Sequence, residues 1–523
     1  MSILLEASHI KYSIADRLLL DIDHLQVYQG ERIGLVGRNG TGKTTLLQIL
    51  DHSISPEQAT VRHYAQCGHI PQLKTVHAHK SDGEVTQTYI QQALDKRPEL
   101  LLADEPTANL DITHIEALEQ QLKNWHGSFI IVSHDRSFLD TLCTTIWELK
   151  DGKINTYKGN YSDYMKQKAL EERQEQLAYQ EYENQKKHLQ EAIKLKKIKA
   201  QQATKKPKNL SDSDARQKGI NVYFANKQKK LQKTAKSLET RLNQLEIKHQ
   251  PRMIQPFKMD ILHSESLNNR IVIRVEDLTG LVNNKTLWNP TSFNIRGGEK
   301  LAIIGDNGVG KSTLINKIVH HDPNVSLSPS AKIGYFSQNL DILKLEKSIL
   351  ENIQDSSKQN ETLIRTVLAR MYFFKDDVHK RVKVLSGGER VKVALAKIFL
   401  SDVNILILDE PTNFLDMEAV DAFESLLQDY EGTLIFASHD RRFIEKVANR
   451  ILMIENQEVN IFESDFNQFK SEQMKQERST TEDEKMILEM KITEILSRLS
   501  IEPTDELEHE FQNLIQKKLE LDD

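Results

Sequence analysis

Cysteine and long apolar segments are both scarce in this chain. Its two cysteines, Cys67 and Cys143, cannot build a disulfide framework in 523 residues, which is typical of a protein kept in a reducing compartment. No stretch approaches 18 uncharged apolar residues, and the longest runs, such as Ile405–Leu408, have the length of buried strands. The first residues, Met1–Glu6, contain no basic region, so we expect no signal peptide. These absences predict a cytoplasmic protein without a membrane domain.

A large excess of one charge is missing as well. The chain has 70 basic and 76 acidic residues, a formal net charge of -6. An even distribution of these charges would argue against a protein that binds nucleic acid. Because 523 residues are too many for a single hydrophobic core, two or more domains are expected, and the charge can differ between them.

The chain contains two similar halves. Three motifs occur twice in the same order: Gly37–Thr44 and Gly305–Ser312, Leu102–Thr107 and Ile407–Thr412, Ser133–Arg136 and Ser438–Arg441. The offset between the copies grows from 266 residues at Gln72 and Gln338 to 305 at the next shared element, so the first half lacks 39 residues there. In the second half this stretch, roughly 349–374, has apolar residues at helical spacing. We therefore expect the first half to have lost most of a helical subdomain.

The first repeated motif matches the phosphate-binding loop G-x-x-x-x-G-K-[ST]. Each copy follows an apolar strand and opens a helix, a context in which backbone N–H groups and the helix N-terminus bind phosphate. Lys43 and Lys311 are placed to contact the β- and γ-phosphates, and Thr44 and Ser312 to hold Mg²⁺. The expected nucleotide contacts are Gly37, Asn39, Gly40, Gly42, Lys43, Thr44 and Thr45, and Gly305, Asn307, Gly308, Gly310, Lys311, Ser312 and Thr313.

Paired carboxylates and a histidine follow in each half. The candidates are Asp104, Glu105 and His134 in the first half and Asp409, Glu410 and His439 in the second. The aspartates end apolar strands and would position Mg²⁺, while the glutamates are placed to orient and deprotonate an attacking water. Solvated residues opening a turn, and a structural histidine, are the alternatives. The repetition of the whole set at one spacing favours a γ-phosphate site.

These motifs, together with Gln72, Gln338 and Leu385–Glu389, resemble the ATP-binding cassette superfamily. The resemblance implies an α/β fold of two cassettes that sandwich two ATP molecules head to tail, with Mg²⁺, in a monomer with an intramolecular cassette pair. It also implies that Gln72 and Gln338 contribute to catalysis and metal binding. Each phosphate loop would face the signature loop of the other cassette, the first site using Ser386, Gly387, Gly388 and Glu389 and the second Ser81 and Gly83.

Departures from the family pattern make the two sites unequal. The first signature contains Asp82, which brings a carboxylate close to the expected phosphate position and opposes binding. The adenine-stacking aromatic of the family would be Tyr12, whereas the corresponding residue of the second half is Gly280. We therefore expect the second site to bind ATP more loosely or to hydrolyse it more slowly.

The segment between the halves is charged and helical. Residues Tyr161–Lys206 contain neither glycine nor proline, and a second such run covers Val222–Gln250. Apolar residues recur at helical spacing in both, which predicts two long helices joined near Pro207–Tyr223 as an antiparallel hairpin. At 1.5 Å per residue the first arm would reach roughly 60 Å.

The positive charge of the chain is concentrated in this hairpin. Between Lys194 and Lys248 there are 16 basic and four acidic residues, a net charge of +12. A solvated helical face is the ordinary explanation of a charge run. Around a tip that contains Val222, Tyr223 and Phe224, such a one-sided run favours contact with a nucleic-acid backbone.

Two cassettes, no membrane domain and a basic hairpin between them resemble the ABC-F family of translation factors, from Met1 to about Lys470. This resemblance implies binding to the ribosomal exit-tRNA site in the ATP-bound state, near P-site tRNA, with the tip directed at 23S rRNA of the peptidyl-transferase centre. Within the family, the long tip and shortened first cassette are similar to Vga-type resistance proteins, which protect ribosomes from lincosamides, pleuromutilins and streptogramin A. The candidate tip residues are Lys205, Lys206, Lys208, Leu210, Lys218, Val222, Tyr223 and Phe224.

The expected domains are a first cassette at 1–157, a linker at 158–265 with its tip near 207–224, a second cassette at 266–470 and an acidic helical extension at 471–523. Three other functions remain open. A housekeeping ABC-F factor would relieve stalled ribosomes without drug specificity. The ATPase subunit of a drug exporter would need a membrane partner, and a DNA-repair ATPase is disfavoured because zinc-ligand cysteines and a very long coiled coil are missing.

Overall fold

The computed structural model describes most of the two cassettes and of the linker. The described residues are 2–14, 17–56, 58–72, 82–108, 110–202, 218–246, 248, 269–282, 285–337, 340, 342–413, 415–463 and scattered positions between 466 and 516, without the side chains of 82–84 and 218–224. The chain divides into two compact units, one formed by Tyr157–Pro256 and the other by the rest of the chain. Most of the predicted extension at 471–523 lies outside the described residues.

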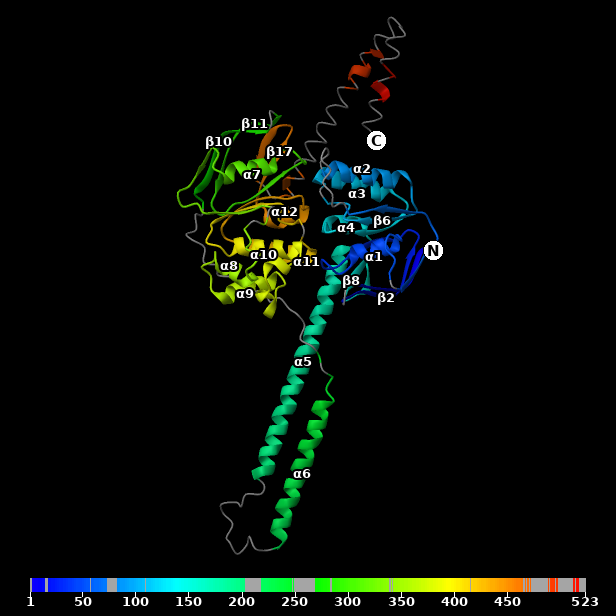
Figure 1. Cartoon of the computed structure of the whole chain (residues 1–523), viewed down its shortest axis with the longest axis vertical. Helices are drawn as coiled ribbons and strands as arrows, with labels where there is room; N and C mark the ends of the chain where they lie inside the picture. The colour runs from blue at the N-terminus through cyan, green and yellow to red at the C-terminus, as the bar shows by residue number, and fades with distance from the viewer. Residues whose placement is uncertain are drawn as a thin grey trace. The chain divides into compact units, whose positions relative to one another are not determined.

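Each cassette is built on a six-stranded, mostly parallel sheet (Figure 1). The first has the order β5-β6-β7-β3-β8-β9, and its strands are β3 (Arg32–Val36), β5 (Cys67–Ile70), β6 (Leu100–Asp104), β7 (Ser128–Val132), β8 (Thr145–Lys150) and β9 (Lys153–Lys158). The second has the order β14-β15-β16-β12-β17-β18, and its strands are β12 (Lys300–Gly305), β14 (Ile333–Phe336), β15 (Ile405–Asp409), β16 (Thr433–Ala437), β17 (Arg450–Glu455) and β18 (Glu458–Phe462). The two orders correspond strand by strand, as the repeated motifs predict.

The central strands are apolar and buried along their whole length. Every residue of β6, β7, β15 and β16 is buried, which is typical of parallel strands covered on both faces. In the first cassette Leu46, Leu47 and Leu50 of α1 pack in one core cluster with Ile33 and Leu35 of β3, all without exposed surface. Each such side chain contributes about 1.5–3 kcal/mol of burial free energy.

An antiparallel sheet of three strands accompanies each large sheet. The first contains β1 (Ile3–Ile14), β2 (Arg17–Tyr28) and β4 (Gln58–His63), and the second contains β10 (Ile271–Val282), β11 (Lys285–Arg296) and β13 (Val325–Leu327). The helices of the first cassette are α1 (Lys43–Leu50), α2 (Asp82–Asp95), α3 (Ile112–Asn124) and α4 (Arg136–Leu142). Those of the second are α7 (Lys311–Val319), α8 (Ile349–Gln354), α9 (Glu361–Arg370), α10 (Gly387–Phe399), α11 (Met417–Gln428) and α12 (Arg441–Val447).

The second cassette has two helices, α8 and α9, between β14 and α10. The apolar residues whose spacing predicts a helix there, Ile364, Val367, Leu368 and Met371, are all buried in the core. In the first cassette, α2 begins at Asp82 after residues 73–81, which lie outside the described residues. No counterpart of α8 or α9 therefore occurs in the described part of the first cassette.

The unit between the cassettes is an antiparallel pair of helices, α5 (Tyr161–Gln202) and α6 (Lys218–Asn243) (Figure 1). Ile193 and Ala200 of α5 and Ala235 of α6 are buried, and an ion pair of 2.7 Å joins Lys197 to Glu239. The second helix begins four residues before the predicted glycine-free run, so Gly219 lies in its first turn. A glycine near a helix end costs at most about 1 kcal/mol.

Candidate functional site

The two phosphate loops have the same geometry. Gly42 and Gly310 precede α1 and α7 with φ of 103° and 107°, a left-handed conformation that favours glycine. Lys43 Nζ donates to the carbonyl oxygen of Gly37 at 2.6 Å, and Lys311 Nζ donates to that of Gly305 at 2.8 Å. Each loop thus surrounds its own lysine at the N-terminus of a helix, where phosphate oxygens are favoured.

An aspartate and a hydroxyl lie together beside each loop. Strands β3, β7 and β6 are adjacent and parallel, so the phosphate loop, the histidine and the acidic pair that follow them meet at one edge of the sheet. Asp104 is hydrogen-bonded to Thr44, and Asp409 to Ser312. Burial raises the pKa of both carboxyl groups, and one oxygen of each, Oδ1, is buried without a hydrogen-bond partner among the described residues.

The adjacent glutamates have a strained backbone. Glu105 and Glu410 have φ of 51° and 48°, a region that costs about 1–2 kcal/mol for residues other than glycine. Their N–H groups donate to the last carbonyl of the strand that precedes each histidine. This conformation directs Glu105 Oε1 to 3.2 Å from His134 Nε2, and Glu410 Oε1 to 3.4 Å from His439 Nε2.

The second glutamate–histidine pair is not a salt bridge at neutral pH. Burial raises the pKa of Glu410 to about 7, although the nearby Lys311 opposes this shift. Burial also lowers the pKa of His439 to about 3, and Lys311 lowers it further. The ring is therefore neutral, and the carboxyl group titrates near pH 7, which suits a group that accepts a proton.

One continuous cavity of about 1590 Å³ runs between the cassettes and is lined by residues from both predicted sets, although Gly37, Gly305, Asp409, Ser386, Gly387 and Glu389 are not among its lining residues. Its lining includes Asn39, Gly40, Gly42, Lys43, Thr44, Thr45, Gln72, Asp104, Glu105 and His134, and Asn307, Gly308, Gly310, Lys311, Ser312, Thr313, Gly388, Glu410 and His439. Gln338 and Ser81 lie outside the described residues. The cavity contains residues of both halves, as expected for nucleotides bound between two cassettes.

The signature loop of the second cassette caps a helix. Ser386 is the N-cap of α10, and its side chain and that of Glu389 form a reciprocal capping box. This arrangement leaves the backbone N–H groups of Gly387 and Gly388 at the helix N-terminus, and Gly388 lines the cavity. In the first cassette α2 begins at Asp82, the position that corresponds to Gly387, and Gly83 lies in its first turn.

The structure does not place Tyr12 among the cavity-lining residues. Its side chain packs on the core of the first cassette, and the residues of that β-hairpin that line the cavity are Ile14 and Leu19. In the second cassette, the position of a Cβ at Gly280 is occupied by the fully buried Trp288, at 2.3 Å. Adenine contact by Tyr12 therefore stays a prediction, and apolar contacts from Ile14 and Leu19 are the alternative that the geometry offers.

Sequence reasoning missed two aspartates that connect the cassettes. Asp111 and Asp416 cap α3 and α11, and each accepts a hydrogen bond from a backbone N–H of the opposite phosphate loop. The bond from Asn307 N to Asp111 is 3.1 Å long, and the bond from Asn39 N to Asp416 is 3.4 Å. The sequence signal that could have identified them is their spacing, because Asp111 and Asp416 lie 305 residues apart, the same offset as the repeated motifs beside them.

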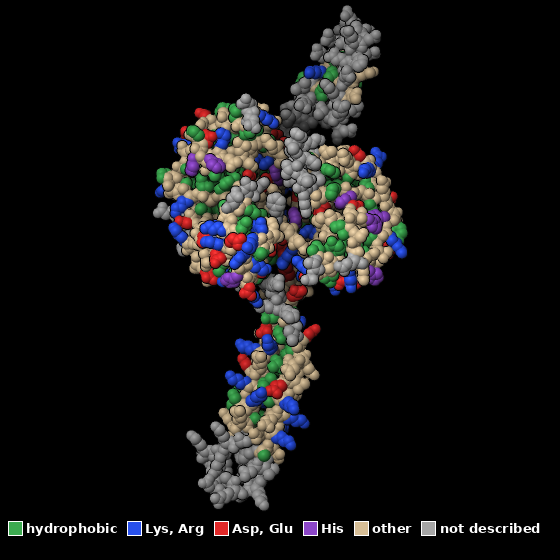
Figure 2. Space-filling view, viewed as in Figure 1, with side chains coloured by type: hydrophobic (Ala, Val, Ile, Leu, Met, Phe, Trp, Pro, Cys, Tyr) green, Lys and Arg blue, Asp and Glu red, His purple; other side chains and the backbone are tan. Residues whose placement is uncertain are grey.

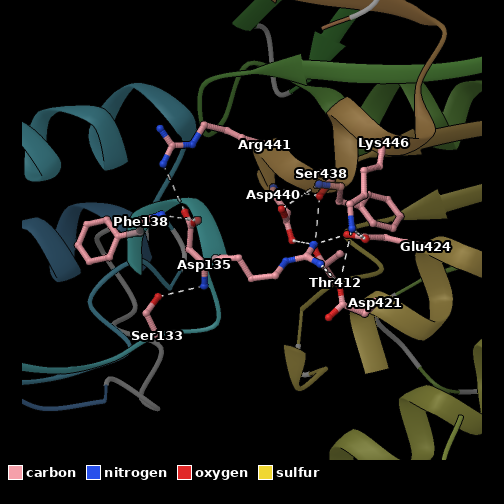
Figure 3. Close-up of polar contacts among 12 residues, drawn as sticks. Ser133, Asp135, Phe138, Thr412, Asp421, Glu424, Ser438, Asp440, Arg441 and Lys446 are labelled. Carbon is pink, nitrogen blue, oxygen red and sulfur yellow. Dashed lines mark hydrogen bonds and ion pairs between the residues drawn. The ribbon is translucent and has the colours of Figure 1, made fainter. Parts of the chain in front are cut away.

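Two arginines also contact the opposite cassette, and Figure 3 shows Arg441 directed at Asp135. Arg136 contacts Asp421 at 2.5 Å, Asp440 at 3.4 Å and Glu424. Its counterpart Arg441 contacts Glu116 at 3.6 Å, Asp135 at 3.7 Å and Glu119. Every residue of the first set lies 305 positions from a residue of the second. The first cluster also contains Lys446, at 2.5 Å from Glu424 and 3.7 Å from Asp421, whereas the corresponding residue of the first cassette is Thr141.

Comparison with known proteins assigns the family. A family model described as ABC transporter matches residues 20–75 and 288–413, and a second with the same description matches 147–259. The chain is 32% identical to the ribosome protection protein VmlR of Bacillus subtilis (strain 168), over 98% of each chain. It is 33% identical to the erythromycin resistance ATP-binding protein MsrA of Staphylococcus epidermidis, over 85% of this chain and 96% of that protein. The chain belongs to the ABC-F family.

Solved structures agree with the fold of this ABC-F protein. The archaeal ribosome recycling factor aABCE1, in complex with the ribosomal stalk protein aP1, aligns with a TM-score of 0.56 at 17% identity, over 85% of this chain and 87% of that one. A chain described as RNase-L Inhibitor aligns with the same TM-score and identity, over 87% of this chain and 90% of that one. No helix in the described part of the ABC-F chain is long and apolar enough to span a membrane.

Proposed function

We propose that this chain is an ATP-dependent ribosome-protection factor. In this proposal the ATP-bound protein occupies the ribosomal exit-tRNA site in the cytoplasm. The linker tip dislodges antibiotics from the peptidyl-transferase centre, and ATP hydrolysis releases the protein. The observation that carries the proposal is a basic helical hairpin inserted between two cassettes, in a chain whose relatives include a ribosome protection protein over nearly their whole lengths.

The paired motifs support ATP hydrolysis. Lys43 and Lys311 would neutralise the β- and γ-phosphates, and the glutamate beside each aspartate would accept a proton from the attacking water. Asp104 and Asp409 each have an unpartnered buried oxygen next to a hydroxyl, which fits a hard cation such as Mg²⁺. Thr44 and Asp104, and Ser312 and Asp409, would hold the metal, which adds positive charge at the phosphates.

The hairpin supports contact with RNA. Lys and Arg side chains are spread over the described surface of the hairpin (Figure 2). The exposed lysines include Lys194, Lys197 and Lys199 on α5 and Lys229, Lys230, Lys233 and Lys236 on α6. Such a row of cations binds phosphates by releasing counterions and needs no sequence recognition. Lys205, Lys206, Lys208 and Leu210 lie outside the described residues, and the side chains of Lys218, Val222, Tyr223 and Phe224 are not described, so their contact with 23S rRNA or drug is part of the proposal.

Lincosamides, pleuromutilins and streptogramin A are the proposed drug classes. They follow from the similarity of the tip segment to Vga-type resistance proteins. A relative of similar identity is named an erythromycin resistance protein, so the drug range within the family varies. A housekeeping ABC-F factor is the second candidate, because several relatives are named only as ATP-binding proteins.

Ribosome sedimentation of a hydrolysis-blocked variant tests the proposal. The Glu105→Gln, Glu410→Gln double variant should pellet with 70S ribosomes in ATP and stay in the supernatant in ADP. The same variant with Lys194, Lys197, Lys229 and Lys233 changed to Gln should lose this binding while it keeps ATP binding. Failure of the double variant to co-sediment would contradict the ribosome partner and favour an exporter subunit. If cells that express the unmodified chain keep their drug sensitivity, the housekeeping ABC-F factor becomes the remaining candidate function.

A further inference from the structure

The interface between the cassettes contains two corresponding ionic clusters beside the cavity, whose arginines have no role in the site described above. Of their members, only Asp135 and Asp440 line the cavity. The clusters join the helix after each capping aspartate to the histidine loop of the opposite cassette. Arg136 and Glu424 are each 1% exposed, and Glu119 and Arg441 are 8% and 9% exposed. Because a buried charge is tolerated only when it is paired, separation of the cassettes would leave Arg136 and Arg441 without these carboxylates, whereas Glu424 would keep Lys446 of its own cassette at 2.5 Å.

Helix α11 contacts the first cassette at two places. At its N-terminus, Asp416 accepts from Asn39 N, and Glu418 accepts from Arg38 Nε at 2.7 Å. Further along, Asp421 and Glu424 bind Arg136, which follows His134 by two residues. The acidic residues of α11 are spaced by three and therefore lie on one face of the helix. A single rigid helix thus fixes the distance between the phosphate loop and the histidine loop of the opposite cassette.

Helix α3 repeats this arrangement toward the second cassette. Asp111 accepts from Asn307 N, Thr113 Oγ1 donates to Asp306 at 3.0 Å, and Glu116 and Glu119 bind Arg441. The spacing of three residues is the same as on α11. The histidine loop of each cassette is therefore held by the cassette that supplies the opposing signature loop.

The two histidine loops also contact each other. Arg136 lies 3.4 Å from Asp440, the residue after His439, and Arg441 lies 3.7 Å from Asp135, the residue after His134. Asp135 caps α4 by accepting from Phe138 N, so its side chain sets the start of that helix and the position of the loop. A shift of one arginine therefore displaces the residue next to the histidine of the other site.

We propose that Arg136 and Arg441 are reciprocal positioning residues, each of which aligns the histidine loop of the ATP site in the opposite cassette and so couples turnover at the two sites. The inference rests on the ATP hydrolysis proposed above. Neither arginine lines the cavity, so each acts through the neighbouring aspartate and histidine and not by touching ATP.

A variant that isolates the first site tests this coupling. In the Glu410→Gln background, phosphate release comes from the first site. Adding Arg441→Ala there should lower kcat by about tenfold, within the usual range of coupling between sites. KM for ATP should stay within about twofold, because Arg441 makes no contact with the first phosphate loop among the described residues. The matched control is Arg442→Ala, the next residue of α12, whose guanidinium makes no ion pair in the described part of the chain.

A double-mutant cycle identifies the route. If Arg441 acts through Asp135, Arg441→Ala should have little further effect on kcat in an Asp135→Asn background, because asparagine still caps α4. An equal tenfold loss in both backgrounds, or an unchanged kcat in the first, would overturn the proposal. If calorimetry shows that the Arg441→Ala variant does not fold, Arg441→Lys takes its place. The lysine variant should lose less activity. Absence of phosphate release from the unmodified chain would instead overturn the proposed function.

Discussion

At the first phosphate loop, Arg38 lies between a ring and a carboxylate of the second cassette. Its guanidinium is 4.6 Å from the centre of the Tyr372 ring and 2.7 Å from Glu418. At the second loop the corresponding residue is Asp306, which accepts a hydrogen bond from Thr113. Tyr372 follows α9, an element without a counterpart in the described part of the first cassette. Because Tyr372 has no counterpart in the described part of the first cassette, the second phosphate loop has no equivalent aromatic contact among the described residues.

A second difference lies beneath the loops. Trp288 is fully buried against Gly310, where a Cβ would approach the indole to 2.4 Å. The equivalent Gly42 faces Leu19 and Leu20. The contacts that the two sites share come from residues that are the same in both halves. Those that differ come from a variable position inside the phosphate loop, Arg38 or Asp306, and from residues outside the repeated motifs, such as Tyr372 and Trp288. The first phosphate loop therefore has a cation–π contact from the opposite cassette, whereas the second loop packs against a larger aromatic side chain of its own core.

The largest expected difference concerns the glutamates proposed to act in catalysis, Glu105 and Glu410. Glu105→Gln should lower steady-state phosphate release by roughly 100-fold, whereas Glu410→Gln should lower it about twofold, because the first site has the complete signature and the Arg38 contact. Malachite-green assays on the purified full chain measure both. The matched control is Glu431→Gln, which changes an exposed residue of the second cassette. Glu424→Ala is unsuitable as a control because it removes a contact between the cassettes. Equal losses in the two glutamate variants would contradict the inequality of the sites.

The repeated motifs were sufficient to predict most of the arrangement that the two sites share. The order of the glycine loop, the Asp-Glu pair and the histidine requires adjacent parallel strands, and the cavity brings these residues together. Both arms of the linker were also predictable, because a segment without glycine or proline and with leucines at helical spacing is typical of a long helix.

The contacts across the interface could not be derived in the same way. Arg136 and Arg441 are the last residues of a repeated motif, but the carboxylates that they bind depend on how the two cassettes face each other. In sequence, the acidic residues of α3 and α11 resemble ordinary solvated helix faces. The position of Tyr12 has a different, local cause, and its contact with adenine stays a prediction. Strand pairing places its side chain on the core and leaves Ile14 and Leu19 at the cavity.

The core of the second cassette offers a smaller effect. Trp288→Leu introduces the leucine that the first cassette has at the equivalent position. The smaller side chain leaves a void beside Gly280 and Gly310, which should lower the free energy of unfolding by about 2 kcal/mol. Differential scanning calorimetry should show one transition lowered by roughly 5 °C. Trp125→Leu, at a partly exposed position in the first cassette, is the matched control and should move Tm much less. An unchanged Tm in the Trp288 variant would show that the tryptophan is not required to support the second loop.

The smallest expected effect isolates the clamp on the first loop. Tyr372→Leu removes the ring from Arg38, a cation–π contact that contributes about 1 kcal/mol when it is partly desolvated. KM for ATP at the first site, measured in the Glu410→Gln background, should rise about fivefold. Asp306→Asn, the matched change at the second loop, keeps an acceptor for Thr113 and should alter KM of the second site by less than twofold in the Glu105→Gln background. If Tyr372→Leu raises KM equally after Arg38→Met, the ring acts through other contacts and the clamp does not explain why the sites differ.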